Sequence, residues 1–241
     1  MGRASDAKEI ASKLISDLKG HANQANVKGM ARYGIRVDNA LGVPMPIIRG
    51  MAKRVGRDHQ LAQLIWDSGI HEARILAALI NEPQKVTFEQ MESWVAEVDS
   101  WDVCDQLCAN LLDKTVYAYQ AARDWSRRDE VFVKRAGYVL MAALAVHDKE
   151  SGNEPFIEFL ALIREGSTDD RNFVKKSVNW ALRQIGKRNS TLHEAAIAMA
   201  KVIDRTESGA AHWIAKDALR ELTNEATLAR LAKKTGPQRP K

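Results

Sequence analysis

Trp101 and Asp105 are the first pair of residues whose types and spacing could do chemistry. They are four residues apart on a helix predicted to begin near Ser100, so both side chains project from one face. The positive end of the helix dipole favours the ionised form of Asp105. Asp102 lies in the first turn, where capping or dipole compensation is the simplest role. This face therefore offers an ionised carboxylate beside an aromatic ring.

Basic residues recur at helical spacing in two later segments. In the first, steps of four, three and four residues place them on one face together with a Trp: Lys176, Trp180, Arg183 and Lys187. In the second, steps of four give His212, Lys216 and Arg220. Lys and Arg bind phosphates while aromatic faces meet bases or sugars, so these basic stripes predict a nucleic-acid cradle. Two ordinary solvated helix faces are the alternative.

Several other residues have a structural interpretation. Arg135 interrupts an apolar segment, so its charge must be paired or in contact with water. Cys104 and Cys108 are interpreted as small apolar core residues, because no further ligand accompanies them at zinc spacing. Trp at helical spacing usually packs in a core, and this is expected of Trp66, Trp94, Trp125 and Trp213.

Apolar residues recur every three to four positions along almost the whole chain, and no segment alternates like a strand. The sequence therefore predicts an all-α fold. In the N-terminal part, helix ends are marked by Gly20, Gly34, Gly56 and Pro83, and helix starts by caps at Asp58, Thr87 and either Asp99 or Ser100. Eight helices are expected after these, at residues 100–114, 115–126, 129–147, 153–165, 169–187, 190–204, 207–222 and 224–234.

The spacing of these helices is regular. Second members of successive pairs start near residues 129, 169 and 207, which gives steps of 40 and 38 residues. Such repeats are typical of HEAT and armadillo-type solenoids, in which every second helix lines one concave wall. We therefore expect residues 1–229 to form a single HEAT-like helical-repeat domain, C-shaped with a concave groove. An irregular helical bundle is the alternative, because the units share little sequence.

The formal net charge of +5 is concentrated at one end of the chain. Residues 230–241 contain five basic residues and no acid, so the other 229 residues balance at 31 basic and 31 acidic. We expect residues 230–241 to be a basic C-terminal tail that is flexible at its end. Net charge alone favours a solvated tail over one that binds a ligand.

The sequence lacks the signatures of several protein classes. Its longest apolar run, residues 139–146, is eight residues long, far below the roughly 20 of a membrane span. P-loop, G-x-G-x-x-G and G-x-S-x-G motifs are absent, and the six His are dispersed. We therefore expect no membrane partner, no metal and no cofactor. Two Cys and an N-terminus without an apolar leader indicate a reducing compartment, which predicts a cytoplasmic protein.

Four short segments follow one another in an order that a known family shares. They are residues 30–34 (M-A-R-Y-G), 100–105 (S-W-D-V-C-D), 133–136 (V-K-R-A) and 175–183 (K-K-S-V-N-W-A-L-R). In this order they resemble the AlkD-like DNA alkylation repair glycosylases, which are monofunctional enzymes built of HEAT-like repeats. Some members carry a Trp where this sequence has Ser100, so one groove contact of the family is missing.

The resemblance implies roles for individual residues. Trp101, Asp105 and Trp180 would form the catalytic cluster, with Arg135 beside it as a contact to the DNA backbone. Tyr33 would contribute a second contact to DNA. The concave groove would then bind DNA, and its phosphates would be met by Lys176, Arg183, Lys187 and Lys216.

The implied reaction is excision of N7-methylguanine or N3-methyladenine from duplex DNA, as in base excision repair. The alkylated base is cationic and leaves easily, so the enzyme must stabilise the charge that grows on deoxyribose. An ionised Asp105 can do this and hold the attacking water, while Trp101 and Trp180 flank the nucleotide. We expect a monomer that acts on alkylated double-stranded DNA, associated with the nucleoid, without cofactor.

Two other functions remain open. A HEAT-like relative could bind damaged or branched DNA without cleaving a glycosidic bond, although phosphate binding alone gives no reason for an acid in the groove. A solenoid that binds only proteins would present apolar anchors where this sequence has its basic stripes.

Overall fold

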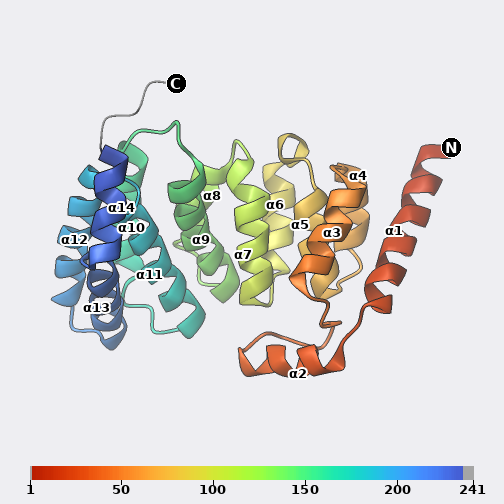
Figure 1. Cartoon of the computed structure of the whole chain (residues 1–241), viewed down its shortest axis with the longest axis horizontal. Helices are drawn as coiled ribbons and strands as arrows, with labels where there is room; N and C mark the ends of the chain where they lie inside the picture. The colour runs from red at the N-terminus through yellow and green to blue at the C-terminus, as the bar shows by residue number, and fades with distance from the viewer. Residues whose placement is uncertain (1, 236–241) are drawn as a thin grey trace. The chain divides into compact units, whose positions relative to one another are not determined.

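The computed structural model describes residues 2–235, and this part of the chain is helical with no β-strand. The chain divides into two compact units, unit 1 with residues 1–117 and unit 2 with residues 118–241 (Figure 1). The expected all-α fold is confirmed. Within residues 2–235, none of the helices combines the length and apolar character that a membrane span requires.

Unit 1 holds seven of the α-helices and two short 3-10 turns. Their bounds are α1 (Gly2–Gly20), α2 (Gln24–Arg32), α3 (Met45–Val55), α4 (His59–Trp66), α5 (His71–Ile80), η1 (Pro83–Lys85), α6 (Phe88–Ala96), α7 (Trp101–Asn110) and η2 (Leu112–Lys114). Helix α5 is the centre of the unit, because it packs against α3, α4 and α7. Almost all of its residues are buried, including the polar His71 and Glu72.

Unit 2 holds the other seven helices of the described chain. Their bounds are α8 (Ala118–Trp125), α9 (Val131–His147), α10 (Glu154–Gly166), α11 (Asn172–Gly186), α12 (Ser190–Asp204), α13 (Gly209–Leu222) and α14 (Glu225–Thr235). Helix α8 pairs with α9, α10 with α11 and α12 with α13, and α11 packs against both α9 and α13 (Figure 1). The second members of the predicted pairs are therefore neighbours. Each of the eight helices predicted from residue 100 onward begins within three residues of its expected start.

Local hydrogen bonds explain where several helices begin. Asp58 Oδ1 accepts the backbone N–H three residues later at 2.9 Å, and Thr87 Oγ1 does the same at 3.2 Å. Ser100 occupies the N-cap position of α7 but makes no side-chain cap. Its hydroxyl oxygen accepts the backbone N–H of Arg36 at 3.0 Å. This long-range bond replaces the expected cap and ties the segment before α3 to α7.

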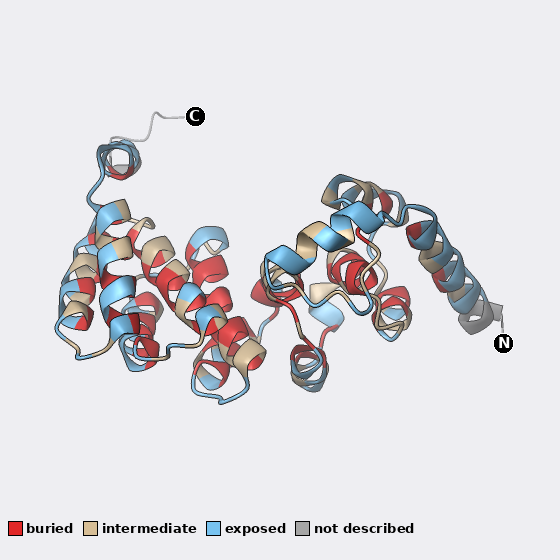
Figure 2. Cartoon of the chain, turned by 90° about the horizontal axis from the view of Figure 1, so that it is seen from below, coloured by how far each residue is buried: buried red, intermediate tan, exposed pale blue. Residues whose placement is uncertain are grey.

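Burial of the Trp side chains tests the core positions predicted for them. Trp66 and Trp94 stack in unit 1 with ring centroids 4.1 Å apart, and Trp125 is fully buried in unit 2, so packing is confirmed for all three. The prediction for Trp213 is wrong, because its side chain is 40% exposed. The buried stripe of α13 consists mainly of small residues, and Trp213 lies beside it. In both units the buried faces of helices are directed at neighbouring helices (Figure 2).

Helix α9 is the buried helix of unit 2. Twelve of its 17 residues are buried, because neighbouring helices cover it on several sides. Gly137 allows the closest approach: a Cβ atom there would lie 2.4 Å from the backbone nitrogen of Ser126, just after α8. A side chain at this position would therefore push α8 and α9 apart.

Helix α14 ends at Thr235, so residues 230–235 of the expected tail are helical. The expected flexible end, residues 236–241, lies outside the described residues. A single domain over residues 1–229, a C shape and a concave groove stay predictions.

Candidate functional site

Helix α7 carries the predicted catalytic pair of unit 1. Trp101 and Asp105 are both partly exposed. They lie off the buried stripe of the helix, which consists of Val103, Cys104, Leu107 and Cys108. The apolar spacing that fixes α7 in the core therefore leaves an aromatic ring and a carboxylate together on its open face, as their four-residue separation predicts.

Tyr33 lies beside Trp101 although 68 residues separate them. The indole Nε1–H of Trp101 donates to the carbonyl oxygen of Tyr33 at 3.1 Å. The Tyr33 side chain itself is 74% exposed. Both residues line a largely apolar cavity of about 530 Å³, together with Met30, Ile35, Val43 and Pro44 among others. Unit 1 thus brings together two of the segments that carry the family resemblance.

Glu72 holds the loop that forms one side of this cavity. Its carboxylate is buried and accepts three backbone N–H groups, from Leu41 at 2.9 Å, Gly42 at 2.6 Å and Val43 at 3.2 Å. Gly42 has a φ of +75°, and a Cβ there would lie 2.3 Å from the carbonyl oxygen of Asn23. Charge-assisted hydrogen bonds of this kind are strong, so Glu72 fixes the loop against α5.

His71 connects α5 to the first turn of α7. Its Nε2 lies 2.8 Å from Oδ2 of Asp102, so Asp102 binds a neighbouring helix as well as its own first turn. Burial alone would lower the pKa of His71, but the hydrogen bond and the negative charge of Asp102 raise it overall. The charged form of His71 is thereby favoured beside Asp102, in the first turn of α7.

Cys104 and Cys108 are confirmed as core residues, because both side chains are completely buried. Burial, followed by the effects of Cys104 and Asp105, raises the pKa of the Cys108 thiol well above its usual value. The thiol therefore stays protonated and unreactive near neutral pH. Within residues 2–235, no three His, Cys, Asp or Glu side chains are grouped so that they could hold a metal ion.

Arg135 is the predicted site residue that lies deepest in unit 2. Its side chain is 5% exposed, and its Nη1 donates to the carbonyl oxygen of Phe173 at 2.7 Å. This hydrogen bond links α9 to α11 and gives the buried guanidinium a polar partner. A contact between Arg135 and the DNA backbone stays a prediction.

The first basic stripe lies on α11 as its spacing predicts. Lys176 is exposed and Trp180 is half-buried. Arg183 and Lys187 follow one and two turns later, but they are engaged with α13. The guanidinium of Arg183 hydrogen-bonds to Glu221, and Lys187 Nζ lies 2.5 Å from the same carboxylate. Partial burial would raise the pKa of Glu221, but these two cations lower it overall.

The second basic stripe, on α13, has an aromatic residue beside it, Trp213, whose spacing predicts a place in the core. Lys175 Nζ lies 5.1 Å from the ring centroid of the exposed Trp213, a cation–π contact between α11 and α13. Lys216 and Arg220 lie three and seven residues after Trp213, and both are exposed. Arg183 and Lys187 lie at the same two distances after Trp180. This shared register was the signal in the sequence that could have identified Trp213.

The predicted site residues therefore fall into two groups. Unit 1 brings Tyr33, Trp101 and Asp105 into one region. Unit 2 places its candidates on three neighbouring helices: Arg135, Lys176, Trp180, Arg183, Lys187 and Lys216. The first group can place a negative charge beside aromatic surface, and the second can bind phosphates. Joint action of both groups on one nucleotide stays a prediction.

Comparisons with known proteins identify a family for this chain. Residues 14–233 match the family model described as DNA alkylation repair enzyme. Uncharacterized proteins of Listeria innocua and Listeria monocytogenes are 26% and 25% identical over 175 residues, which are 72% of this chain and 73% of each relative.

One solved structure has the same fold. It is described as "A new family of proteins related to the HEAT-like repeat DNA glycosylases with affinity for branched DNA structures". Its TM-score is 0.72 at 17% identity, and the match covers 87% of this chain and 94% of that chain. The HEAT-like fold and the family resemblance expected from the sequence are confirmed.

Proposed function

Because this chain belongs to the DNA alkylation repair enzyme family, we propose that it is a DNA glycosylase that hydrolyses the N-glycosidic bond of cationic alkylated bases in duplex DNA. The observation that carries the proposal is the placement of Asp105, a partly exposed carboxylate one helical turn from Trp101 on the open face of α7. N7-methylguanine and N3-methyladenine are its expected substrates, since these bases are already positively charged.

The proposed reaction needs only water as a second reactant. The bond between C1′ and the base nitrogen breaks, and its electron pair leaves with the base, which becomes neutral. Positive charge then develops on the deoxyribose, and the carboxylate of Asp105 stabilises it electrostatically. A water molecule forms the new bond to C1′ and gives up its proton to Asp105 or to solvent. The aromatic face of Trp101 adds a second favourable contact for the developing cation.

Unit 2 supplies the binding surface in this proposal. Lys176 and Lys216 are exposed on neighbouring helices and would meet phosphates, while Trp180 would lie against the nucleotide. The exposed Trp213, held under Lys175, adds a further aromatic face on the same pair of helices. The proposed partner is alkylated duplex DNA, bound by a monomer that acts at the nucleoid of the cytoplasm.

Release of free base is the direct test. The whole chain is incubated with a duplex that carries one N7-methylguanine, and the free base is measured by chromatography. A duplex with uracil at the same position is the matched neutral substrate. The proposal predicts release of N7-methylguanine and not of uracil. Release of neither base, or of both at similar rates, would contradict it.

A DNA-binding protein without glycosylase activity is the second candidate. The observation that favours it is the likeness in fold to a protein described as having affinity for branched DNA. Binding to a four-way junction is compared with binding to a linear duplex of equal length. Preference for the junction, together with no release of any cationic base, would support this second function.

A further inference from the structure

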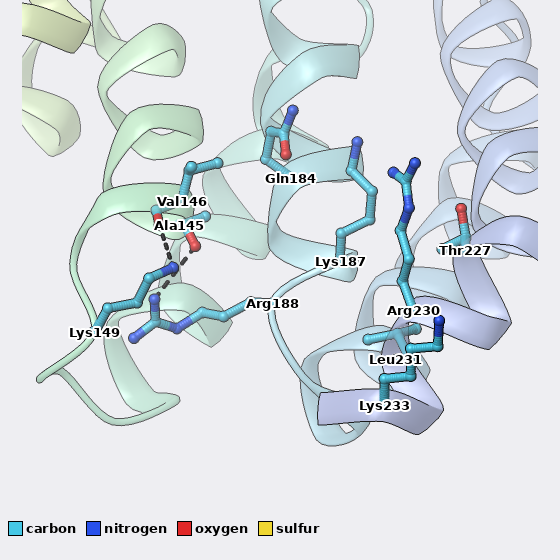
Figure 3. Close-up of a pocket in the computed structure, with 10 residues that line it drawn as sticks. All are labelled: Ala145, Val146, Lys149, Gln184, Lys187, Arg188, Thr227, Arg230, Leu231 and Lys233. Atoms are coloured by element: carbon cyan, nitrogen blue, oxygen red, sulfur yellow. Dashed lines mark hydrogen bonds between the residues drawn. The ribbon is translucent and has the colours of Figure 1, made fainter. Parts of the chain in front are cut away.

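A basic cavity of about 510 Å³ lies in unit 2, at the C-terminal ends of α9 and α11 and beside α14 (Figure 3). Among the side chains that the structure describes, ten line it, and none of these ten is acidic. Half of them are basic: Lys149, Lys187, Arg188, Arg230 and Lys233. We call this cavity the C-terminal basic pocket. Like charges gathered around a concave surface repel one another, and an anion in the pocket would relieve this repulsion.

Two of the five cations are fixed in place by backbone carbonyl groups. Lys149 Nζ donates to the carbonyl oxygen of Val146, in the last turn of α9. Arg188 donates to the carbonyl oxygens of Ala145 at 3.3 Å and Ser151 at 2.7 Å. The bonds to Ala145 and Val146 satisfy carbonyl groups that have no partner within the last turn of α9. Both cations are therefore preorganised on one side of the pocket.

Lys187 forms an ion pair with Glu221, a carboxylate beside the pocket. Its Nζ lies 2.5 Å from Glu221, but this carboxylate also binds Arg183, so one negative charge is shared by two cations. In Figure 3 the side-chain ends of Gln184, Lys187 and Arg230 point the same way from α11 and α14. Hydrogen-bond donors from two helices thus point to the same side of the pocket (Figure 3).

Helix α14 presents the remaining two cations. Arg230 and Lys233 are exposed and stand one turn apart. Thr227 and Leu231 are 6% and 7% exposed, and together they pack α14 against the rest of unit 2. The basic residues at the start of the expected tail therefore line a cavity.

We propose that the C-terminal basic pocket binds an internal phosphate of the DNA backbone. Arg groups match phosphate oxygens in a bidentate manner, and Lys adds point charges and single donors. Gln184 and Lys187 lie four and seven residues after Trp180, so they share its face of α11.

The distance from Trp180 sets the position of this phosphate. Seven residues of α-helix span about 10 Å, and phosphates of one DNA strand are about 3.4 Å apart along the axis. A strand that passes Trp180 along this face would therefore place the phosphate about three nucleotides farther on in the pocket. This register rests on the proposed function, because that function puts the damaged nucleotide at Trp180.

The salt dependence of DNA binding tests the pocket without any need for catalysis. The double variant Arg230→Gln/Lys233→Gln removes two charges from the pocket. The control Lys201→Gln/Arg205→Gln removes two exposed charges at the C-terminal end of α12 in the same unit. One lost phosphate contact lowers the slope of log K against log salt by about 0.9. We expect that loss in the first variant and a smaller loss in the control. Equal slopes in the two variants would overturn the proposal.

Chemically modified DNA locates the phosphate. A methylphosphonate, which is uncharged, replaces single phosphates at successive positions from the lesion in duplexes with 5′-hydroxyl ends. We expect the substitution about three nucleotides away to weaken binding by the unchanged protein and to have no further effect on the Arg230→Gln/Lys233→Gln variant. If every substitution acts equally on both proteins, or if the variant loses affinity only for duplexes with a 5′-phosphate, an internal site is contradicted.

Failure of this inference and failure of the proposed function give different results. A slope that falls in the pocket variant, with no base released by the unchanged protein, would retain the pocket and reject the glycosylase. Base release by the unchanged protein, together with equal salt slopes in the pocket variant and its control, would retain the glycosylase and reject the pocket. Thermal unfolding of each variant confirms that these exposed substitutions leave the fold intact.

Discussion

Units 1 and 2 differ in charge. Residues 1–117 contain 14 Lys and Arg against 15 Asp and Glu, a net charge of −1, whereas residues 118–241 contain 22 against 16, a net charge of +6. The proposed catalytic acid and Tyr33, a predicted DNA contact, belong to unit 1. The residues predicted to contact phosphates belong to unit 2. The difference suggests a division of roles: unit 2 attracts DNA, and unit 1 offers the negative charge that a developing sugar cation needs.

The two units also support their candidate residues differently. In unit 1, buried polar groups of α5 hold the surroundings of Trp101: Glu72 fixes a loop and His71 binds α7. In unit 2, partly exposed ion pairs connect α11 to α13 through Glu221. Buried charge-assisted bonds contribute far more to stability than partly exposed ion pairs. Substitution of the buried polar groups of α5 should therefore affect the fold, and substitution of the exposed basic residues of unit 2 should affect binding.

Glu72→Gln should give the largest loss of stability. The amide keeps the shape of the carboxylate but removes its charge and turns one acceptor into a donor that faces backbone N–H groups. We expect the free energy of unfolding to fall by about 3 kcal/mol in denaturant titrations. Glu9→Gln, an exposed acid on α1, is the control. Equal stability of the two variants would show that the loop does not depend on Glu72.

Arg135→Met tests the one predicted DNA contact of unit 2 that is buried. Loss of the guanidinium leaves the carbonyl oxygen of Phe173 without this donor, so the free energy of unfolding should fall by about 2 kcal/mol. Arg205→Met, at an exposed position of the same unit, should change it little. If Arg135→Met leaves stability intact and lowers the salt slope of DNA binding, Arg135 is a phosphate contact and not a link between helices.

Lys176→Gln and Lys216→Gln should weaken DNA binding more than Arg183→Gln does. The two Lys side chains are exposed, whereas Arg183 is paired with Glu221. Loss of one phosphate contact lowers the salt slope by about 0.9, which corresponds to about eightfold weaker binding at 0.1 M salt. Fluorescence anisotropy over a range of salt concentrations measures both quantities. An unchanged slope for both Lys variants would identify this stripe as a solvated face.

The smallest expected effect is the pH dependence of stability that His71 of unit 1 contributes. The pKa of His71 is raised in the folded protein, so its contribution to stability is complete below about pH 6.5, the unfolded value, and is lost as pH rises through the folded value. The free energy of unfolding, measured between pH 6 and pH 9, should show this decline in the unchanged protein and a weaker decline in Asp102→Asn. The same decline in both proteins would contradict the assigned partner.

The fold was largely predictable because local patterns determine it. Apolar spacing predicted the helices, and side-chain caps such as Asp58 and Thr87 marked where they begin. The four-residue separation of Trp101 and Asp105 predicted their shared open face. These features depend on interactions within one helix, which a linear sequence displays directly.

The features that escaped prediction depend on contacts between helices. Glu72 binds a loop about 30 residues earlier in the chain, and Glu221 binds two cations 34 and 38 residues before it. A helix sequence shows the charges on its own face but not those on the neighbouring helix. Trp213 was assigned to the core for the same reason, since only the packing of α13 reveals which of its sides is covered.

Asp105→Asn tests the division of roles most directly, because it preserves shape while it removes one negative charge. At saturating enzyme, single-turnover release of N7-methylguanine should slow by roughly 10² or more. The Kd for the same duplex should stay equal or fall slightly, since a charge that repels phosphates is gone. Asp67→Asn, an exposed acid of unit 1, should change neither quantity. Full activity of Asp105→Asn, or a loss of release matched by an equal loss of affinity, would contradict the account.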